Sequence, residues 1–95
     1  MDMIFEWDPR KAASNLSKHG VSFEEAMTVF ADPLARIFLD EDHSVDEQRE
    51  IIIGHSHTNR LLVVCFTAPA ESVRIFSARA ATATERKDYE ENIVQ

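Results

Sequence analysis

Residues 61–67, with the sequence LLVVCFT, form an uninterrupted apolar run that is rich in β-branched side chains. An apolar run of this length without alternation is typical of a strand buried on both faces, so it predicts the central strand of a sheet. Shorter stretches on either side of it also favour strands, and they lie at residues 3–7, 36–40, 51–53 and 72–77. In the last of these, alternation places Val73 and Ile75 inward and Arg74 outward.

Two stretches in the first third of the chain carry helix signals. The dipeptide Asp-Pro at positions 8–9 predicts the start of a helix, because the carboxylate caps free amides and proline fits the first turn. Gly20 lies where a left-handed cap would end this helix. Ser22 and Glu25 then form a capping box in front of a second helix. Its apolar stripe consists of Phe23, Ala26, Met27 and Phe30.

A further capping box, Thr82 with Glu85, opens a C-terminal helix. The expected elements follow one another as β-α-α-β-β-β-α, with no internal repeat and no linker. We therefore predict an α+β fold in one compact domain over residues 1–95. It combines an antiparallel β meander of three to four strands with two N-terminal helices and one C-terminal helix.

Charge limits what the protein can bind. The 95 residues include 10 Lys+Arg and 17 Asp+Glu, giving a net charge of −7, which argues against broad electrostatic attraction to nucleic acid. The charge is uneven, however, because residues 60–79 hold three arginines and a single acid. We therefore expect a local cationic patch on an acidic protein.

Three features favour a cytoplasmic location. The longest apolar run is too short to span a bilayer, and the acidic N-terminus does not resemble a secretory signal. The single cysteine, Cys65, fits a buried thiol in a reducing compartment, and a catalytic nucleophile is disfavoured because no base is expected beside it.

Arg60, Arg74 and Arg79 are the candidate phosphate ligands. In a meander, the start of one strand and the end of the next meet at the same end of the sheet, so we expect Arg60 to approach Arg74 or Arg79 there. Guanidinium groups bind phosphate in a bidentate manner. RNA can be cleaved without metal when its own 2′-hydroxyl attacks the phosphorus, and His43 or Glu47 could act as the base. The alternative is that these arginines pair with Glu71, Glu85 or the acidic turn at residues 40–47.

A metal site is the weaker hypothesis. His43, His55 and His57 could approach one another, with carboxylates available from Asp42, Asp46 and Glu47. The chain contains no HExxH or CxxC spacing, so a solvated turn is favoured over a metal site. It also has no GxGxxG or P-loop motif, and we expect neither a cofactor nor a metal.

The sequence also resembles that of a known family. Residues 5–26, FEWDPRKAASNLSKHGVSFEEA, are similar to the opening of the BrnT toxins. The similarity continues at residues 29–33, 42–44, 47–49, 53–54, 60–64, 74–79 and 85–90. The resemblance implies the toxin of a type II toxin–antitoxin pair, a ribonuclease that inhibits translation and has a fold like that of the RelE toxins. It also implies a BrnA-like antitoxin with a ribbon-helix-helix domain, through which the complex would contact operator DNA.

This sequence departs from the family pattern at a few positions. Residues 68–70 read Ala-Pro-Ala where the family usually has Glu-Arg-Gly, and alanine stands at Ala80 and Ala83 where basic residues are expected. Up to three cations would then be missing from the predicted phosphate site. Either this is a natural member with reduced or different activity, or the sequence was altered so that the toxin could be expressed. The alternative function is a weakened or inactive toxin-fold protein that binds the antitoxin and acts as a co-repressor.

Overall fold

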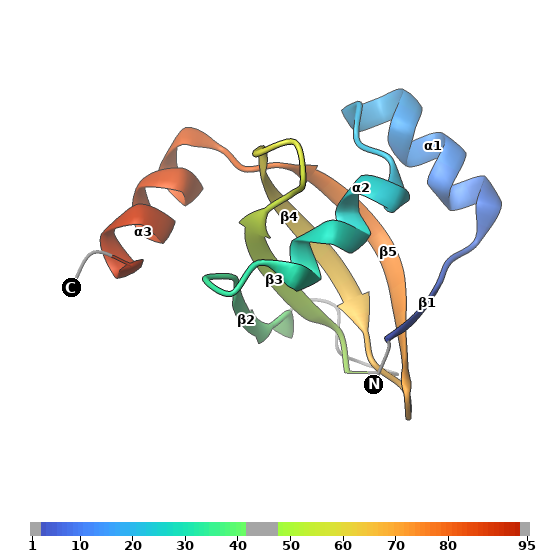
Figure 1. Ribbon diagram of the computed structural model, residues 1–95. Helices are drawn as coiled ribbons and strands as arrows, with labels where there is room; N and C mark the ends of the chain where they lie inside the picture. Colours follow the sequence, from blue (N-terminus) through green and yellow to red (C-terminus); the bar gives the residue numbers. More distant parts are fainter. Residues whose placement is uncertain (1–2, 42–47, 94–95) are drawn as a thin grey trace.

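The computed structural model describes residues 3–41 and 48–93, and within them it forms one five-stranded mixed sheet with three α-helices (Figure 1). The elements are β1 (Ile4–Glu6), α1 (Pro9–His19), α2 (Phe23–Thr28), the 3-10 helix η1 (Val29–Ala31), β2 (Arg36–Leu39), β3 (Glu50–His55), β4 (Leu61–Thr67), β5 (Ser72–Ala80) and α3 (Ala83–Ile93). Strands β2 to β5 form an antiparallel meander, and β1 adds to β5 in parallel, giving the order β1-β5-β4-β3-β2. The α+β prediction is confirmed. The parallel pairing of β1 is an addition that local sequence patterns did not indicate.

The N-terminal helices begin and end at the capping residues that the sequence indicated. Asp8 Oδ1 accepts a hydrogen bond of 2.8 Å from the backbone N–H two residues on. Gly20 ends α1 with φ 68°, the left-handed conformation that glycine adopts without a Cβ clash. Ser22 Oγ accepts from the Glu25 N–H at 3.0 Å and caps α2. The predicted stripe of α2 continues through η1, so the local signals place both helices correctly.

The main core lies between the sheet and the layer formed by α1 and α2. Alternate residues of β4, namely Leu62, Val64 and Phe66, point into it. Leu61 and Val63 are buried on the opposite face, in a smaller cluster with Ile53 and Tyr89. The prediction that residues 61–67 form a central strand covered on both faces is therefore confirmed, although cover on the second face is partial. We call this second face, from which α1 and α2 are absent, the open face.

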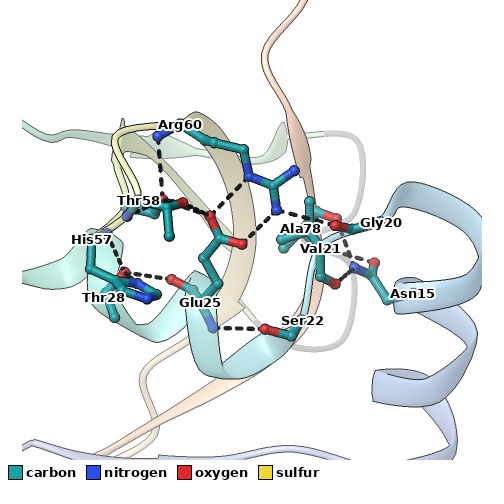
Figure 2. Close-up of polar contacts among 11 residues, drawn as sticks. Asn15, Gly20, Val21, Ser22, Glu25, Thr28, His57, Thr58, Arg60 and Ala78 are labelled. Atoms are coloured by element: carbon teal, nitrogen blue, oxygen red, sulfur yellow. Dashed lines mark hydrogen bonds and ion pairs between the residues drawn. The ribbon is translucent and has the colours of Figure 1, made fainter.

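Asn15 joins α1 to the sheet. The residue is 6% exposed, and its Nδ2 donates to the carbonyl oxygens of Val21 (2.9 Å) and Ala78 (2.8 Å) (Figure 2). The Asn15 Oδ1 accepts from the Ala78 N–H at 3.1 Å. Strand β1 pairs with Ser72–Arg74 of β5, so within residues 3–41 and 48–93 no strand lies beside the outer edge of β5 at Ala78. The amide of Asn15 takes the place of that neighbour, because it offers a donor and an acceptor as a peptide group does.

Helix α3 is held over one end of the open face by Tyr89. The Tyr89 hydroxyl donates to Leu34 O (3.2 Å) and lies 3.4 Å from Asp32 Oδ2. Asp32 itself accepts from the His55 N–H at 2.7 Å. The loop that carries Asp32 comes this close because Gly54 lacks a side chain, since a Cβ there would lie 2.8 Å from that of Ala35. Tyr89 is buried, while the other described side chains of α3 are exposed, apart from the half-buried Glu85.

Candidate functional site

Two adjoining cavities occupy the open face. Both are bordered by Ile51, Val63 and Arg79, so they form one groove that crosses the sheet. The first, which we call the cationic cavity, has a volume of about 400 Å³ and is further lined by Lys11, Asp40, Arg49, Cys65, Phe76 and Ser77. The second, the α3 cavity, has a volume of about 410 Å³ and is further lined by Arg36, Phe38, Ile53, Glu85, Asp88, Tyr89 and Asn92. Volumes of this size are typical of small-ligand sites.

A β-bulge shapes the cationic cavity. Cys65 pairs with Ser77 and the next residue of β4 pairs with Ile75, so Phe76 is the extra residue of β5. The Arg49 guanidinium carbon lies 4.1 Å from the centroid of the Phe76 ring, and Lys11 Nζ lies 5.3 Å from it. Cation–π contact with one ring thus brings a cation of α1 and a cation of the β2–β3 connection to the same cavity.

Arg79 lies where the two cavities meet. It points to the open face because it pairs across the strands with Val63. Its Nη1 and Nη2 donate to Glu85 at 2.7 and 2.9 Å, and this pairing lowers the pKa of Glu85 to about 2. Glu85 also accepts from the Thr82 N–H, and so the predicted capping box holds the ion pair in place. The Arg79 side chain remains 41% exposed to the groove.

Cys65 is half-buried in the cationic cavity. Its Sγ lies 3.7 Å from Asp40 Oδ2, and burial together with the Asp40 carboxylate raises the pKa of the thiol to about 11. A thiol with so high a pKa stays protonated at neutral pH. The thiol is thus half-buried rather than buried as expected, and it has a carboxylate beside it, while the expectation that Cys65 is not a nucleophile stays a prediction.

The structure does not bring the three candidate arginines together, which corrects the predicted geometry. Arg60 and Arg79 do lie at the same end of the sheet, but Arg60 binds Glu25 of α2 on the helix-covered side. Arg74 shares the open face with Arg79 but lies five residues away on β5, about 16 Å along the strand. It pairs with Glu6 of β1 at 2.7 Å. Each of the three arginines forms an ion pair, and of the partners that the sequence offered, Glu85 is the one seen among the described residues.

The Arg60–Glu25 pair is the centre of a polar cluster (Figure 2). Glu25 accepts hydrogen bonds from Arg60 Nε (2.9 Å) and Nη2, and from the hydroxyls of Ser56 (2.7 Å) and Thr58 (2.6 Å). Arg60 Nη2 also donates to Gly20 O at 3.1 Å. The cluster therefore fixes the turn between β3 and β4 against α2. The Arg60 guanidinium has a structural role there and already has hydrogen-bond acceptors.

The acid sensitivity of folding tests this cluster. Arg60, the largest cause, lowers the pKa of Glu25 from 4.5 to about 2. A carboxylate with a lowered pKa stabilises the folded state above its unfolded pKa, and this contribution is lost as the pH falls from about 4.5 to about 2. We expect Glu25→Gln to lower the free energy of unfolding by about 2 kcal/mol at neutral pH and to flatten its decline in acid. Urea unfolding across pH 3–7 measures both, with the exposed neighbour Glu24→Gln as control. Parallel wild-type and Glu25→Gln profiles would contradict this assignment.

The remaining candidate residues are the histidines and the carboxylates of the acidic turn, and the structure describes some of them. His43 and Glu47, the candidate bases, lie outside the described residues, as do Asp42 and Asp46. His55 Nδ1 lies 3.7 Å from Asp32, and His57 Nδ1 lies 3.4 Å from Thr28 Oγ1. The described part of the chain contains no group of three or more His, Cys, Asp or Glu side chains able to hold a metal ion. Across residues 3–41 and 48–93, no helix is long and apolar enough to cross a membrane.

This chain has alanine or proline at positions where the family pattern has basic residues. These positions lie at both ends of the sheet. Ala80 and Ala83 are exposed and adjoin Arg79 at the end of β5 and the start of α3. Residues 68–70 lie in the β4–β5 turn at the opposite end. We expected all of the missing cations at the end of the sheet where the phosphate site was predicted. For the position in the β4–β5 turn this expectation is wrong.

Sequence reasoning missed Lys11, Arg36 and Arg49 as groove residues. Lys11 and Arg49 do stand inside the segments that resemble the BrnT toxins, and this was the one available signal. Alternation alone could not reveal them, because Lys11 comes from a helix and Arg49 precedes its strand. The groove residues as a group include four cations and three carboxylates, so the groove is mildly basic on a protein of net charge −7.

Fold and groove together define a class: a small α+β protein with a cationic, aromatic-lined groove on the open face of a mixed sheet. The family model described as "Ribonuclease toxin, BrnT, of type II toxin-antitoxin system" matches residues 7–85, and the chain belongs to this family. It is thus a toxin of the BrnT ribonuclease family, and membership in a type II system implies an antitoxin partner.

A solved structure supports the fold. The chain is similar to the crystal structure of the Brucella abortus ribonuclease toxin BrnT, with a TM-score of 0.65 and 23% sequence identity. The alignment covers 85% of this chain and 99% of the Brucella chain. A comparison with curated proteins gave no match.

Proposed function

We propose that this protein is a metal-independent endoribonuclease that inhibits translation in the cytoplasm by cleaving RNA. The observation that carries the proposal is the groove on the open face, where Arg79 lies beside the Phe76 ring and its two cations. Family membership adds the expectation of ribonuclease activity. A BrnA-like ribbon-helix-helix antitoxin would neutralise the toxin and provide the only contact of the complex with operator DNA.

The groove supplies what an internal transesterification needs. In this reaction the 2′-oxygen of one nucleotide attacks the adjacent phosphorus, the bond to the 5′-oxygen of the next nucleotide breaks, and a 2′,3′-cyclic phosphate remains. Negative charge grows on the phosphoryl oxygens, and Lys11, Arg49 and Arg79 are placed to stabilise it. The reaction also needs a base that takes the 2′-hydroxyl proton and an acid that protonates the leaving oxygen. We propose His43 and Glu47 for these roles.

Arg60 and Arg74 were also candidate catalytic residues. Each already binds a carboxylate away from the groove, so the geometry favours structural roles for them. Their catalytic assignment stays a prediction, which the Arg60→Ala and Arg74→Ala variants test.

Cleavage of matched substrates tests the proposed function. Purified protein is incubated with ribosome-free total RNA, in one reaction with EDTA and in another with Mg²⁺, and the cleavage sites are mapped. An oligoribonucleotide containing one such site is then compared with the same oligomer carrying a 2′-deoxy nucleotide there. We expect cleavage of the RNA with a 2′,3′-cyclic phosphate end and none of the 2′-deoxy oligomer, because the attacking oxygen is missing. Cleavage that requires a metal, or that proceeds without the 2′-hydroxyl, would refute the mechanism.

One observation favours the alternative, a weakened toxin that acts as a co-repressor. Ala80 and Ala83 place two small side chains beside Arg79, while Glu85 neutralises its charge. Under this alternative, intact RNA would remain after incubation while the antitoxin still bound the protein. The same cleavage assay therefore decides between the two functions.

A further inference from the structure

The α3 cavity has a wall of unusual composition. Asp88, Tyr89 and Asn92 lie on one face of α3, and this face is turned toward the sheet. A helix face that packs on a sheet is normally apolar, and among the α3 side chains that the structure describes, Tyr89 is the one that joins the apolar cluster. The carboxylate of Asp88 and the amide of Asn92 instead border the cavity.

Several polar groups that border this cavity could form further hydrogen bonds with a ligand. The Asn92 Nδ2 donates to the Asp88 backbone oxygen at 2.7 Å, which leaves the Asn92 Oδ1 as an acceptor. Among the described residues, neither the Asp88 carboxylate nor the Arg36 guanidinium on the facing strand β2 has a side-chain partner. Two acceptors on one wall thus face one donor group on the other.

An aromatic side chain completes the cavity. Phe38 of β2 lines it and is 51% exposed, so its ring is accessible to a flat ligand. Stacking on exposed aromatic rings, combined with hydrogen bonds to base edges, is the usual way in which proteins recognise bases of single-stranded RNA. The α3 cavity also adjoins the cationic cavity through Arg79, so a base held here would belong to a nucleotide next to the bound phosphate.

We propose that the α3 cavity is a nucleobase subsite that favours adenine and cytosine, in which the exocyclic amino group lies beside an unprotonated ring nitrogen at the Watson–Crick edge. The inference deepens the proposed function and rests on RNA as the substrate. An amino group has two N–H donors and can serve both Asp88 and Asn92, while Arg36 can donate to the adjacent ring nitrogen. Uracil and hypoxanthine carry a carbonyl oxygen at that position, which the Asp88 carboxylate repels.

Binding of uncleavable RNA tests the subsite. Single-stranded 2′-O-methyl hexamers are used, because their blocked 2′-oxygen cannot attack the phosphorus. Oligo-adenosine is compared with oligo-inosine, and oligo-cytidine with oligo-uridine, so that each pair matches ring size while the amino group changes. We expect the wild-type protein to bind the amino member of each pair at least about 5-fold more tightly. Asp88→Ala and Asn92→Ala should bring both ratios toward one, while Glu90→Gln, an exposed residue on another face of α3, should leave them unchanged.

The outcomes separate the subsite from the catalytic proposal. Equal affinities within both pairs, or ratios that survive in the Asp88→Ala/Asn92→Ala double variant, would overturn the subsite even if RNA is cleaved. Selective binding by a protein that cleaves no RNA would leave the subsite standing and refute the ribonuclease. Circular dichroism of each variant verifies that α3 is still folded.

Discussion

Replacing Asn15 with alanine should lower the free energy of unfolding by about 3–4 kcal/mol, because three buried backbone groups lose their partner. Val21 and Ala78, whose backbone groups the amide satisfies, are both fully buried. Each buried polar group left without a hydrogen bond costs about 1–3 kcal/mol, and entry of a water molecule would offset part of the sum. Urea denaturation of the wild type and the variant measures the difference.

Two further variants separate hydrogen bonding from packing. Asn15→Leu fills a similar volume without donors or acceptors, so it should destabilise about as much as Asn15→Ala. Ser14→Ala, at the exposed neighbouring position of α1, should change stability by less than about 0.5 kcal/mol. If Asn15→Leu restored wild-type stability, the amide would be filling space rather than completing the edge of β5.

Replacing Arg79 with alanine should reduce kcat/KM for RNA cleavage about 100-fold or more, the largest effect expected on activity. Removal of one group that stabilises transition-state charge typically costs this much. Arg79 lines both cavities, so the variant loses the cation at the centre of the groove. Arg79→Lys should recover part of the activity because it keeps the charge but not the bidentate geometry.

The ion pair with Glu85 allows a structural effect to be distinguished from a catalytic one. Arg79→Ala and Glu85→Gln break the same contact, so they should lower the melting temperature by similar amounts. Only Arg79→Ala should bring the large loss of cleavage. Equal losses of cleavage in the two variants would show that Arg79 acts by holding α3 rather than by binding phosphate. Arg86→Ala, on the exposed side of α3, serves as the charge control.

Local signals were sufficient to predict most of the fold. The caps at Asp8, Ser22 and Thr82 each use residues within a few positions of one another, so they can be recognised without knowledge of the tertiary structure. The central strand was evident because burial on both faces demands a continuous apolar run. The parallel pairing of β1 left no such signal, since its partner β5 begins 66 residues after β1 ends.

The candidate site was harder to predict because it depends on which face each side chain takes. Arg60 and Arg79 were correctly expected at one end of the sheet, but a shift of one residue along a strand reverses the face. Arg60 found its partner 35 residues away in Glu25, a choice set by tertiary packing. The position of Phe76 follows from a bulge, which simple alternation cannot anticipate.

The pairing of the first strand with the last affects how the chain folds during synthesis. Ile4 pairs with Ser72, and the apolar faces of α1 and α2 are covered by side chains of β4 and β5. Contacts between residues so distant in sequence slow folding, because the intervening chain must be ordered first. Arg79 itself lies near the end of β5, so a nascent chain that lacks β5 has neither a closed sheet nor a complete groove. The topology thus delays assembly of the candidate site until β5 has been synthesised and has left the ribosome.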